Sequence, residues 1–556
     1  MENQRSFLFI ALFLTLTMLY MEWQKDYHPR PLPAAQIENA ASQPAPTLDV
    51  PGVEAPSTDA ASTDLAKPQV QTATAVKKPQ GRSIRVQTDV YDLRIDTRGA
   101  VIDQLTLTQH PKSKKTPDDL VELFTRNEVE TYLLNTGMTA SWQGEQPTHL
   151  VEWKSAAETY SLDDGQDTLQ VPFTWTSADG VTVSKTFNFS RNSFAFTIDY
   201  KIVNNSGKNV AVRPYAQLSR SHLPLSRSMF DVDSYSYKGP AWFDGEKYEK
   251  LKTKDLMDDA IDTEITSGWL ATLEHHFLAA IVPAAGKPVK FTAKSKDENS
   301  YQLTAAAETL QVASGQSINV SQQFFAGPKI QKDLAAISEK LDLTTDYGVF
   351  SIISKPLFWL LSWVYGFIGN WGWAIVVVTL MIKAAFYPLT AKSARSMAAM
   401  KKIQPRIKLL QERYKDDRQK LSQATMDVYR KEKINPAAGC LPILIQFPFF
   451  LGFYWLLIES VELRQAPWML WIQDLSSKDP LFILPVLYGV TMYLQQKVQP
   501  MSGGNPEMMR VMKFMPIAMV GLFSFFPAGL VLYWITNSAV TVVQQWRINS
   551  VIAKEK

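Results

Sequence analysis

Residues 371–390 restrict the fold more than any other stretch, because they read as a membrane-crossing helix that carries a cation. Their sequence, WGWAIVVVTLMIKAAFYPLT, is mostly apolar and contains one charged residue, Lys383. About 20 apolar residues cross a bilayer as an α-helix, and a lysine at the bilayer centre costs about 2.5–3.5 kcal/mol. Lys383 therefore either faces a bundle interior or a hydrated cavity, or it snorkels from a position near a helix end.

Five further apolar segments predict a polytopic α-helical membrane protein with six spans. One lies near the start of the chain without a small-residue cleavage site after it, so we expect residues 1–27 to form an uncleaved transmembrane anchor. Residues 391–436 are basic and the loop at 459–479 is acidic, so the charge rule places both chain ends in the cytoplasm, including a tail at 547–556. The other four segments, 441–458, 481–495, 511–526 and 530–545, form four transmembrane helices with short loops within 437–546.

Between the first two spans, the sequence predicts a linker and a large all-β domain outside the membrane. Residues 28–80 contain no aromatic residue and are dense in Pro, Ala, Ser and Thr, which predicts a disordered linker. From 81 to 327 apolar and polar residues alternate, as in a predicted hairpin around Arg191-Asn192-Ser193, which favours a β-sandwich. Residues 328–370 turn to helical spacing and predict connecting helices and an amphipathic helix in the membrane interface.

Residues 391–436 predict a cytoplasmic helical hairpin. They hold thirteen Lys or Arg against five Asp or Glu, and Met400, Ile403 and Ile407 step at heptad spacing before a charged turn at 415–417. Two interpretations of the positive charge stay open. It is a solvated face that also orients the chain, or it is a docking surface for ribosomal RNA or lipid head groups.

Signatures of enzymes are absent from the sequence. It contains no G-x-x-x-x-G-K-[ST], H-E-x-x-H or G-x-S-x-G motif. Only His275 and His276 are adjacent histidines, and in a strand their side chains would point to opposite faces, which disfavours a shared metal ion. We predict no catalytic residue, cofactor or metal, and the net charge of +3 gives no argument for DNA binding. A carbohydrate-active enzyme on a membrane anchor is a rival interpretation, but it would not need a polar-lined helical core.

Polar side chains recur on the predicted cytoplasmic half of the spans. Thr379 precedes Lys383 by about one helical turn, and on the last helix Asn537, Thr541 and Gln544 share a face because they are four and three residues apart. They either line a hydrated groove or form hydrogen bonds between helices, which are common in membranes and worth about 0.6 kcal/mol each. The predicted groove residues with Lys383 are Thr379, Gln446, Gln495, Asn537 and Thr541.

Several of these stretches resemble the YidC/Oxa/Alb family of membrane protein insertases, in its form from Gram-negative bacteria. The similarity is carried by GNWGWAIVVVTLMIK, FYPLT, KINPAAGCLPILIQFPFFLGFYWLL and FPAGLVLYW, and the order of domains matches along the whole chain. The resemblance implies a five-helix insertase core in the inner membrane, a groove open to cytoplasm and lipid, and a periplasmic β-supersandwich. It implies as partners nascent membrane proteins, the ribosome, components of the Sec translocon and membrane lipids.

The resemblance also implies roles for three residues. Lys383 matches the groove cation, which is usually Arg in the family, and a Lys keeps the point charge but loses the two-pronged contact with a carboxylate. Thr379 and Trp534 match positions that meet the substrate, with Trp534 in place of a more usual Tyr. A transporter for ions or small molecules would also use a buried cation and is the alternative, although the sequence shows none of the inverted repeats typical of that class.

Overall fold

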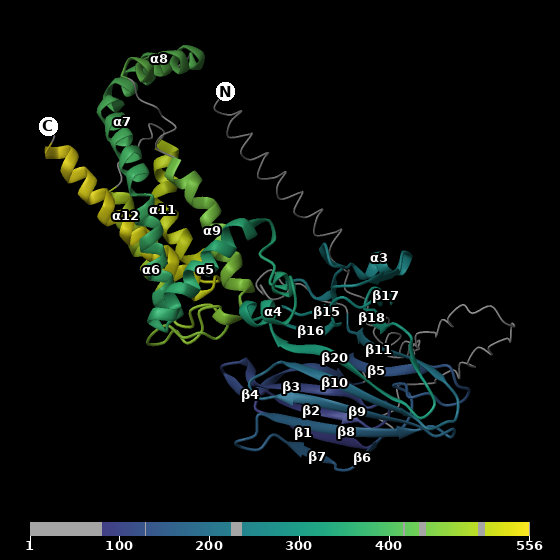
Figure 1. The fold of residues 1–556 in the computed structure, drawn as a ribbon. Coiled ribbons are helices and arrows are strands. Elements are labelled where there is room, and N and C mark those ends of the chain that lie inside the picture. The colour runs from purple at the N-terminus through teal and green to yellow at the C-terminus, as the bar shows by residue number, and fades with distance from the viewer. Residues whose placement is uncertain are drawn as a thin grey trace, which may run out of the picture. The chain divides into compact units, whose positions relative to one another are not determined.

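The computed structural model describes residues 81–127, 129–223, 236–414, 417–432, 441–498 and 506–554. The anchor predicted at 1–27 and the linker predicted at 28–80 lie outside the described residues. The rest divides into a β unit that ends at Thr345 and a helical unit that begins at Asp346 (Figure 1). This division falls later than the predicted domain end at residue 327.

The β unit contains two large sheets, which confirms the prediction of a large all-β domain. The first has eleven strands in the order β14-β17-β18-β11-β5-β4-β3-β2-β1-β7, with β19 paired to β11. Only β1 and β7 pair in parallel within it. The strands are β1 (Ser83–Gln87), β2 (Tyr91–Asp96), β3 (Val101–Ser113), β4 (Thr116–Arg126), β5 (Thr131–Ala140), β7 (Thr159–Ser161), β11 (Val210–Ser221), β14 (Ile261–Ile265), β17 (Val289–Asp297), β18 (Ser300–Ala307) and β19 (Leu310–Val312).

The second sheet has nine antiparallel strands in the order β13-β12-β15-β16-β20-β10-β9-β8-β6. In β9 every second side chain is buried, as a strand with one covered face requires. The strands are β6 (Lys154–Ser155), β8 (Thr168–Thr176), β9 (Val181–Ser190), β10 (Ala195–Asn204), β12 (Gly239–Phe243), β13 (Tyr248–Lys250), β15 (Trp269–Leu273), β16 (Phe277–Val282) and β20 (Ser317–Pro328).

Turns account for one confirmed and one wrong prediction in this unit. The hairpin around residues 191–193 joins β9 to β10, and Asn192 adopts φ +55°, which a turn at this point requires. His275 and His276 do not point to opposite faces, because β15 ends at Leu273 and both lie in the turn before β16. Their buried rings stack with centroids 3.7 Å apart. No group of three or more metal-ligating side chains is found among the described residues.

Helices α4 (Gln331–Ile337) and η2 (Leu341–Thr344) belong to the β unit, together with α3 (Thr253–Asp258). Leu334 and Leu341 are fully buried in a cluster that includes Trp269 of β15. The predicted connecting segment 328–370 is therefore divided, because its first part completes the core of the β unit.

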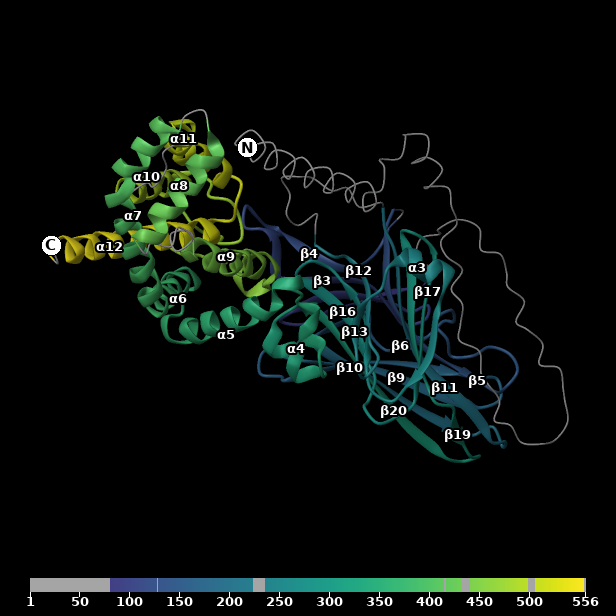
Figure 2. The ribbon, with the colours of Figure 1, turned by 90° about the horizontal axis from the view of Figure 1, so that it is seen from above.

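The helical unit contains α5 and the helices of the predicted core. Seen from above in Figure 2, α5 and α6 follow one another, and α12 packs against α6 and α9. The elements are η3 (Gly348–Phe350), α5 (Ser351–Ile368), α6 (Trp371–Ala385), α7 (Tyr387–Arg413), α8 (Arg418–Lys431), α9 (Leu441–Glu459), η5 (Val461–Leu463), α10 (Ile483–Val498), α11 (Pro506–Phe523) and α12 (Ala528–Lys554).

Two predicted helix boundaries in this unit are wrong. The helix predicted over 371–390 ends at Ala385, and α7 starts at Tyr387 at an angle of 61° to it. Pro388 explains the break, because it has no backbone N–H and its ring disfavours a continuous helix. The helix predicted over 530–545 likewise does not end at residue 545, since α12 continues as helix to Lys554 and takes in most of the predicted tail at 547–556.

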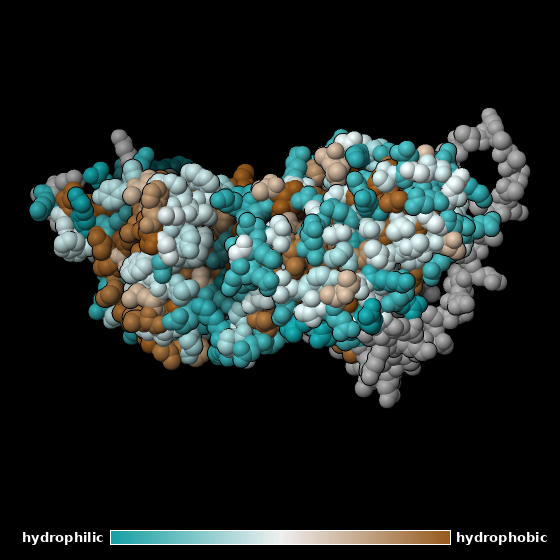
Figure 3. Space-filling model, turned by 60° about the horizontal axis from the view of Figure 1, so that its bottom comes forward, coloured by the Kyte–Doolittle hydropathy of each residue, from teal (hydrophilic) through white to brown (hydrophobic). Residues whose placement is uncertain are grey.

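Apolar side chains gather on the outside of the helical unit (Figure 3), with Ile352, Trp359 and Phe367 of α5 strongly exposed. Among the described residues, Gly348–Ile368 is long and apolar enough to cross a membrane. The bent pair Trp371–Ala385 and Tyr387–Met400 is long and apolar enough only when the two helices are taken together as one span. The prediction of six spans is not confirmed by this count. The interfacial position predicted for the helix of residues 351–368 likewise stays a prediction, because its composition also suits a span.

Candidate functional site

The ammonium of Lys383 lies where three helices meet. Lys383 is in the last turn of α6, and its Nζ donates to Thr541 Oγ1 of α12 at 2.9 Å and to Gln446 Oε1 of α9 at 3.4 Å. The side chain is half-buried. The structure therefore brings together three of the predicted groove residues, which are far apart in the sequence.

Helix α12 supplies most of the remaining contacts around this cation. The Thr541 hydroxyl donates to the carbonyl oxygen of Asn537 at 2.7 Å, so it keeps its oxygen lone pairs for Lys383. Gln544 Nε2 donates to the backbone carbonyl oxygen of Lys383 at 3.3 Å. Gln544 shares a face with Thr541 three residues earlier, which is the sequence signal for its place in the site.

Neutral oxygens are the acceptors of the Lys383 ammonium. Within the part of the chain that the structure describes, no carboxylate lies within 4.0 Å of Lys383 Nζ, whereas exposed pairs such as Lys420 and Asp417 do form. A half-buried cation without a counter-ion is costly, and it becomes more favourable when an anion approaches. The arrangement can therefore attract a carboxylate that is brought to it.

Trp534 lies in an aromatic cluster next to this polar group and not within it. Its ring is 5.2 Å from Phe450, 5.8 Å from Tyr488 and 5.9 Å from Phe523, measured between centroids. Its indole Nε1 is buried and has no hydrogen-bond partner among the described residues. The site thus combines an apolar wall with one unused donor.

Two predicted groove residues contribute less than expected. Thr379 is buried, and its hydroxyl donates to the carbonyl oxygen of Ile375 in its own helix at 2.7 Å. Gln495 is half-buried on α10 and shares no hydrogen bond with the Lys383 group among the residues described. Sequence spacing indicates which residues share a face of a helix, but it could not fix the rotation of each helix about its axis.

The opposite end of the helical unit is closed by the loop between α9 and α10. Lys383 lies about 18 Å along α6 from Trp371 at 1.5 Å per residue. Near Trp371, Asn370 Nδ2 donates to the carbonyl oxygen of Trp468 at 3.0 Å, and Gly529 N donates to that of Leu475 at 2.9 Å. These bonds tie the loop to the first turns of α6 and α12.

A buried carboxylate holds the same loop from within. Asp479 accepts hydrogen bonds from Trp471 Nε1 at 3.0 Å and from the backbone N–H of Leu484 at 2.7 Å. An acceptor at this place satisfies an N–H in the first turn of α10 that has no partner within the helix. One end of the unit is thus closed by a well-bonded loop, and the other presents Lys383.

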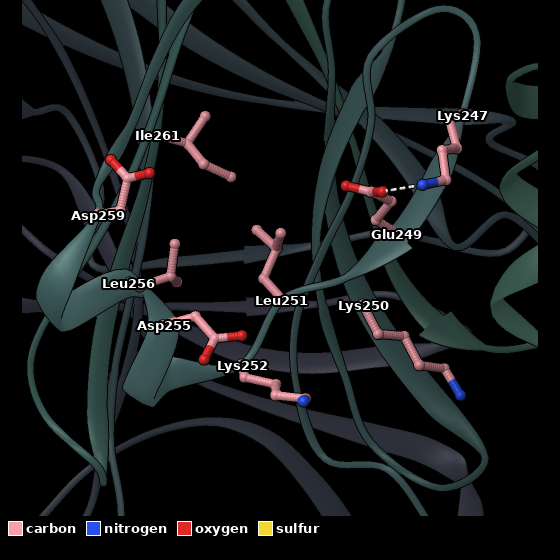
Figure 4. A pocket seen from close by; sticks show the side chains of 9 residues that line it. All are labelled: Lys247, Glu249, Lys250, Leu251, Lys252, Asp255, Leu256, Asp259 and Ile261. Carbon is pink, nitrogen blue, oxygen red and sulfur yellow. Dashed lines mark hydrogen bonds and ion pairs between the residues drawn. The ribbon is translucent and has the colours of Figure 1, made fainter.

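A separate pocket of about 470 Å³ lies in the β unit, beside α3 (Figure 4). Leu251, Leu256 and Ile261 form its apolar part, and Lys247 pairs with Glu249 at its edge. None of the predicted site residues lines it, and its mixed charges do not indicate a chemistry.

Comparison with known proteins decides the family. Residues 83–360 match the family described as YidC periplasmic domain, and residues 363–555 match the family described as 60Kd inner membrane protein. The membrane protein insertase YidC of Thioalkalivibrio sulfidiphilus is 40% identical over 569 residues, covering 100% of this chain and 99% of that protein. The chain belongs to the YidC family of membrane protein insertases. The membrane protein insertase YidC of Methylococcus capsulatus is 42% identical over 556 residues, covering 100% of this chain and 99% of that protein.

A solved structure titled as an active YidC insertase with its first transmembrane domain resolved has a TM-score of 0.39 and 20% identity, covering 84% of this chain and 92% of that one. The matched descriptions are those of an inner-membrane protein with a periplasmic domain. The resemblance inferred from the sequence motifs is confirmed, and the family supports an insertase and not a transporter.

Proposed function

We propose that this YidC-family chain receives nascent or newly made inner-membrane proteins and releases their apolar segments into the bilayer. The observation that carries the proposal is the half-buried Lys383, held by Thr541 and Gln446 with no carboxylate within 4.0 Å among the described residues. A polar N-terminal flank with acidic residues would be drawn to this cation. The aromatic wall at Trp534 would take the apolar segment beside it.

The energetics need no nucleotide. Twenty apolar residues at about −0.3 to −0.6 kcal/mol each favour transfer into lipid by roughly 6–12 kcal/mol. A membrane potential adds about 2.3 kcal/mol per negative charge moved outward per 100 mV. The role of the Lys383 group is then to hold the polar flank briefly, while partitioning of the apolar segment drives insertion.

The unequal ends of the helical unit support a direction for this process. The end with the loop of residues 460–480 is tied down by backbone and side-chain hydrogen bonds, as described for Asn370 and Asp479. We assign that end to the periplasm and the Lys383 end to the cytoplasm, with both chain termini cytoplasmic. The substrate would therefore enter from the cytoplasm and leave sideways into lipid.

The helices α7 and α8 are the proposed cytoplasmic reception surface. They carry most of the basic residues of 391–436, and exposed pairs such as Arg406 with Glu432 neutralise only part of that charge. This surface suits the ribosome or anionic lipid head groups. Cooperation with components of the Sec translocon belongs to the same proposal and rests on the family alone.

Site-specific crosslinking to a ribosome-bound nascent membrane protein tests the proposal. A photocrosslinker at Lys383 or Trp534 should label the apolar segment or its flank. As a matched control, a crosslinker at Val543 should label lipid, because this residue of α12 is 63% exposed on a different face from Thr541. Equal labelling of the nascent chain from Val543 and Lys383 would contradict a substrate path along the Lys383 face.

A further inference from the structure

The break between α6 and α7 leaves the end of α6 short of hydrogen-bond donors. The last four carbonyl groups of an α-helix have no partner within the helix. Phe386 N still donates to the carbonyl oxygen of Ile382 at 3.0 Å, but Pro388 has no N–H to offer to the carbonyl of Ala384. The carbonyl of Lys383 lies between these two positions, in the turn that carries the functional cation.

The side chain of Gln544 takes over at this point. Its Nε2 donates to the Lys383 carbonyl oxygen at 3.3 Å, and three residues earlier Thr541 accepts from Lys383 Nζ at 2.9 Å. One face of α12 therefore holds both the backbone and the ammonium of the same lysine. Two contacts of this kind fix the position of the residue as well as the rotamer of its side chain.

The amide oxygen of Gln544 shows that no second partner orients this side chain among the described residues. Gln544 Oε1 is buried and has no hydrogen-bond partner among the described residues. An amide whose acceptor remains unused is held by its donor side alone. The contact with the Lys383 carbonyl is thus the single hydrogen bond that orients the Gln544 side chain among the residues described.

We propose that Gln544 is a positioning residue that ties the broken end of α6 to α12 and so sets where the Lys383 ammonium lies in the groove. The inference rests on the proposed function, because position matters only if Lys383 meets the substrate. Without the tie, the turn that bears Lys383 can move with α7, and the cation is presented in several places. A substrate flank that relies on charge would lose more than one that does not.

The test compares two neighbouring glutamines in the full-length chain. Gln544→Met keeps the length of the side chain and removes its donor. Gln545→Met is the matched control, because Gln545 is the next residue, is buried, and its amide donates to Asn549 within α12 at 3.0 Å and not to α6. Each variant is assayed for insertion of one reporter in two versions, with an acidic or a neutral N-terminal flank.

Gln544→Met should lower insertion of the acidic reporter relative to the neutral one by about three- to tenfold, the range expected for loss of one positioning hydrogen bond. Gln545→Met should keep the wild-type ratio. A wild-type ratio in Gln544→Met, or an equal loss of both reporters, overturns the inference. If Lys383→Met also keeps the wild-type ratio, the electrostatic step of the proposed function fails as well. If Lys383→Met lowers the ratio but Gln544→Met does not, only the positioning role of Gln544 fails.

A distance measurement checks the tie without relying on insertion. In a Cys440→Ser background, spin labels are placed at Leu380 of α6 and Leu409 of α7, which are 45% and 66% exposed. The distance distribution should broaden or shift in Gln544→Met and stay unchanged in Gln545→Met. An unchanged distribution in folded Gln544→Met contradicts the positioning role, whatever the insertion assay gives.

Discussion

Replacing Lys383 with methionine removes the charge at the centre of the site and keeps most of the apolar stem. In the folded protein the variant loses two hydrogen bonds, to Thr541 at 2.9 Å and to Gln446 at 3.4 Å. Both partners are neutral, and the Thr541 hydroxyl still donates to Asn537. We therefore expect a loss of folding stability of only about 1 kcal/mol, so that the main effect falls on substrate binding.

The size of that effect follows from the charge. At 4 Å and an effective dielectric constant of about 20, an ion pair with a substrate carboxylate contributes about 4 kcal/mol before desolvation. To form this ion pair, the carboxylate must lose water and Lys383 must give up its hydrogen bond to Thr541. Both costs reduce the net contribution of the ion pair toward the roughly 1.5–3 kcal/mol typical of hydrogen bonds to charged groups. Lys383→Met should thus lower insertion of an acidic-flank substrate by about ten- to hundredfold relative to a neutral-flank version.

The assay is insertion into inverted membrane vesicles or reconstituted liposomes at matched levels of the variant. Lys383→Arg is the control, because it keeps the charge and gains a two-pronged contact with carboxylates. It should retain the preference for acidic flanks. An unchanged preference in Lys383→Met, at normal expression, would refute the reasoning from charge.

Three further changes test other parts of the structure. Lys185→Met should cost about 2–5 kcal/mol of stability, seen in thermal unfolding, because this fully buried lysine donates to three backbone carbonyls at 2.8–3.1 Å. Burial raises the pKa of Asp103 to about 6. Between about pH 4 and 6, this carboxyl therefore holds a proton in the folded state but has lost it in the unfolded chain. Stability should fall by up to about 3 kcal/mol as pH rises from about 4 to 6, and Asp103→Asn should flatten that profile in denaturation experiments. Gly372→Ala should loosen the closed end, measured by faster hydrogen exchange, because a Cβ there would lie 2.2 Å from the Trp468 ring.

The helices of the core could be predicted closely from sequence because apolar runs and their polar ends define them. The segment predicted at 441–458 is observed as Leu441–Glu459, and that at 530–545 begins at Ala528. The end of α12 was missed, since the basic and polar residues after 545 stop the apolar pattern but not the helix. A helix that leaves the membrane continues without an apolar signal.

The break at Phe386 was also missed, although its cause lies in the sequence. Pro388 is tolerated in the first turn of a helix, so it is compatible with a new helix that begins at Tyr387 as well as with a bend in one long helix. The apolar pattern runs across both, and it favoured a single span. Only the direction of the chain after Phe386 separates the two possibilities.

Which polar side chains meet could not be predicted, because spacing gives the face of a helix but not what that face contacts. Thr541 and Gln446 reach Lys383, while Gln495 on a comparable half of α10 does not do so among the described residues. The motif resemblance implies that Lys383 is the groove cation, and this role stays a prediction. The rotation of each helix about its axis depends on packing, for example of Phe450 against Trp534.

The two ends of the helical unit differ in how firmly they are held, and this difference bears on function. At the closed end, the carboxylate of Asp479 accepts hydrogen bonds from the loop and from α10, and the amide of Asn370 donates one to the loop. Ser460 and Leu475 of this loop are fully buried. At the other end, α6 breaks, and side chains of α12 and α9 hold Lys383. Local opening is favoured where bonds are few. Motion that admits a substrate is therefore expected at the Lys383 end, with the closed end as the fixed frame against which α7 moves.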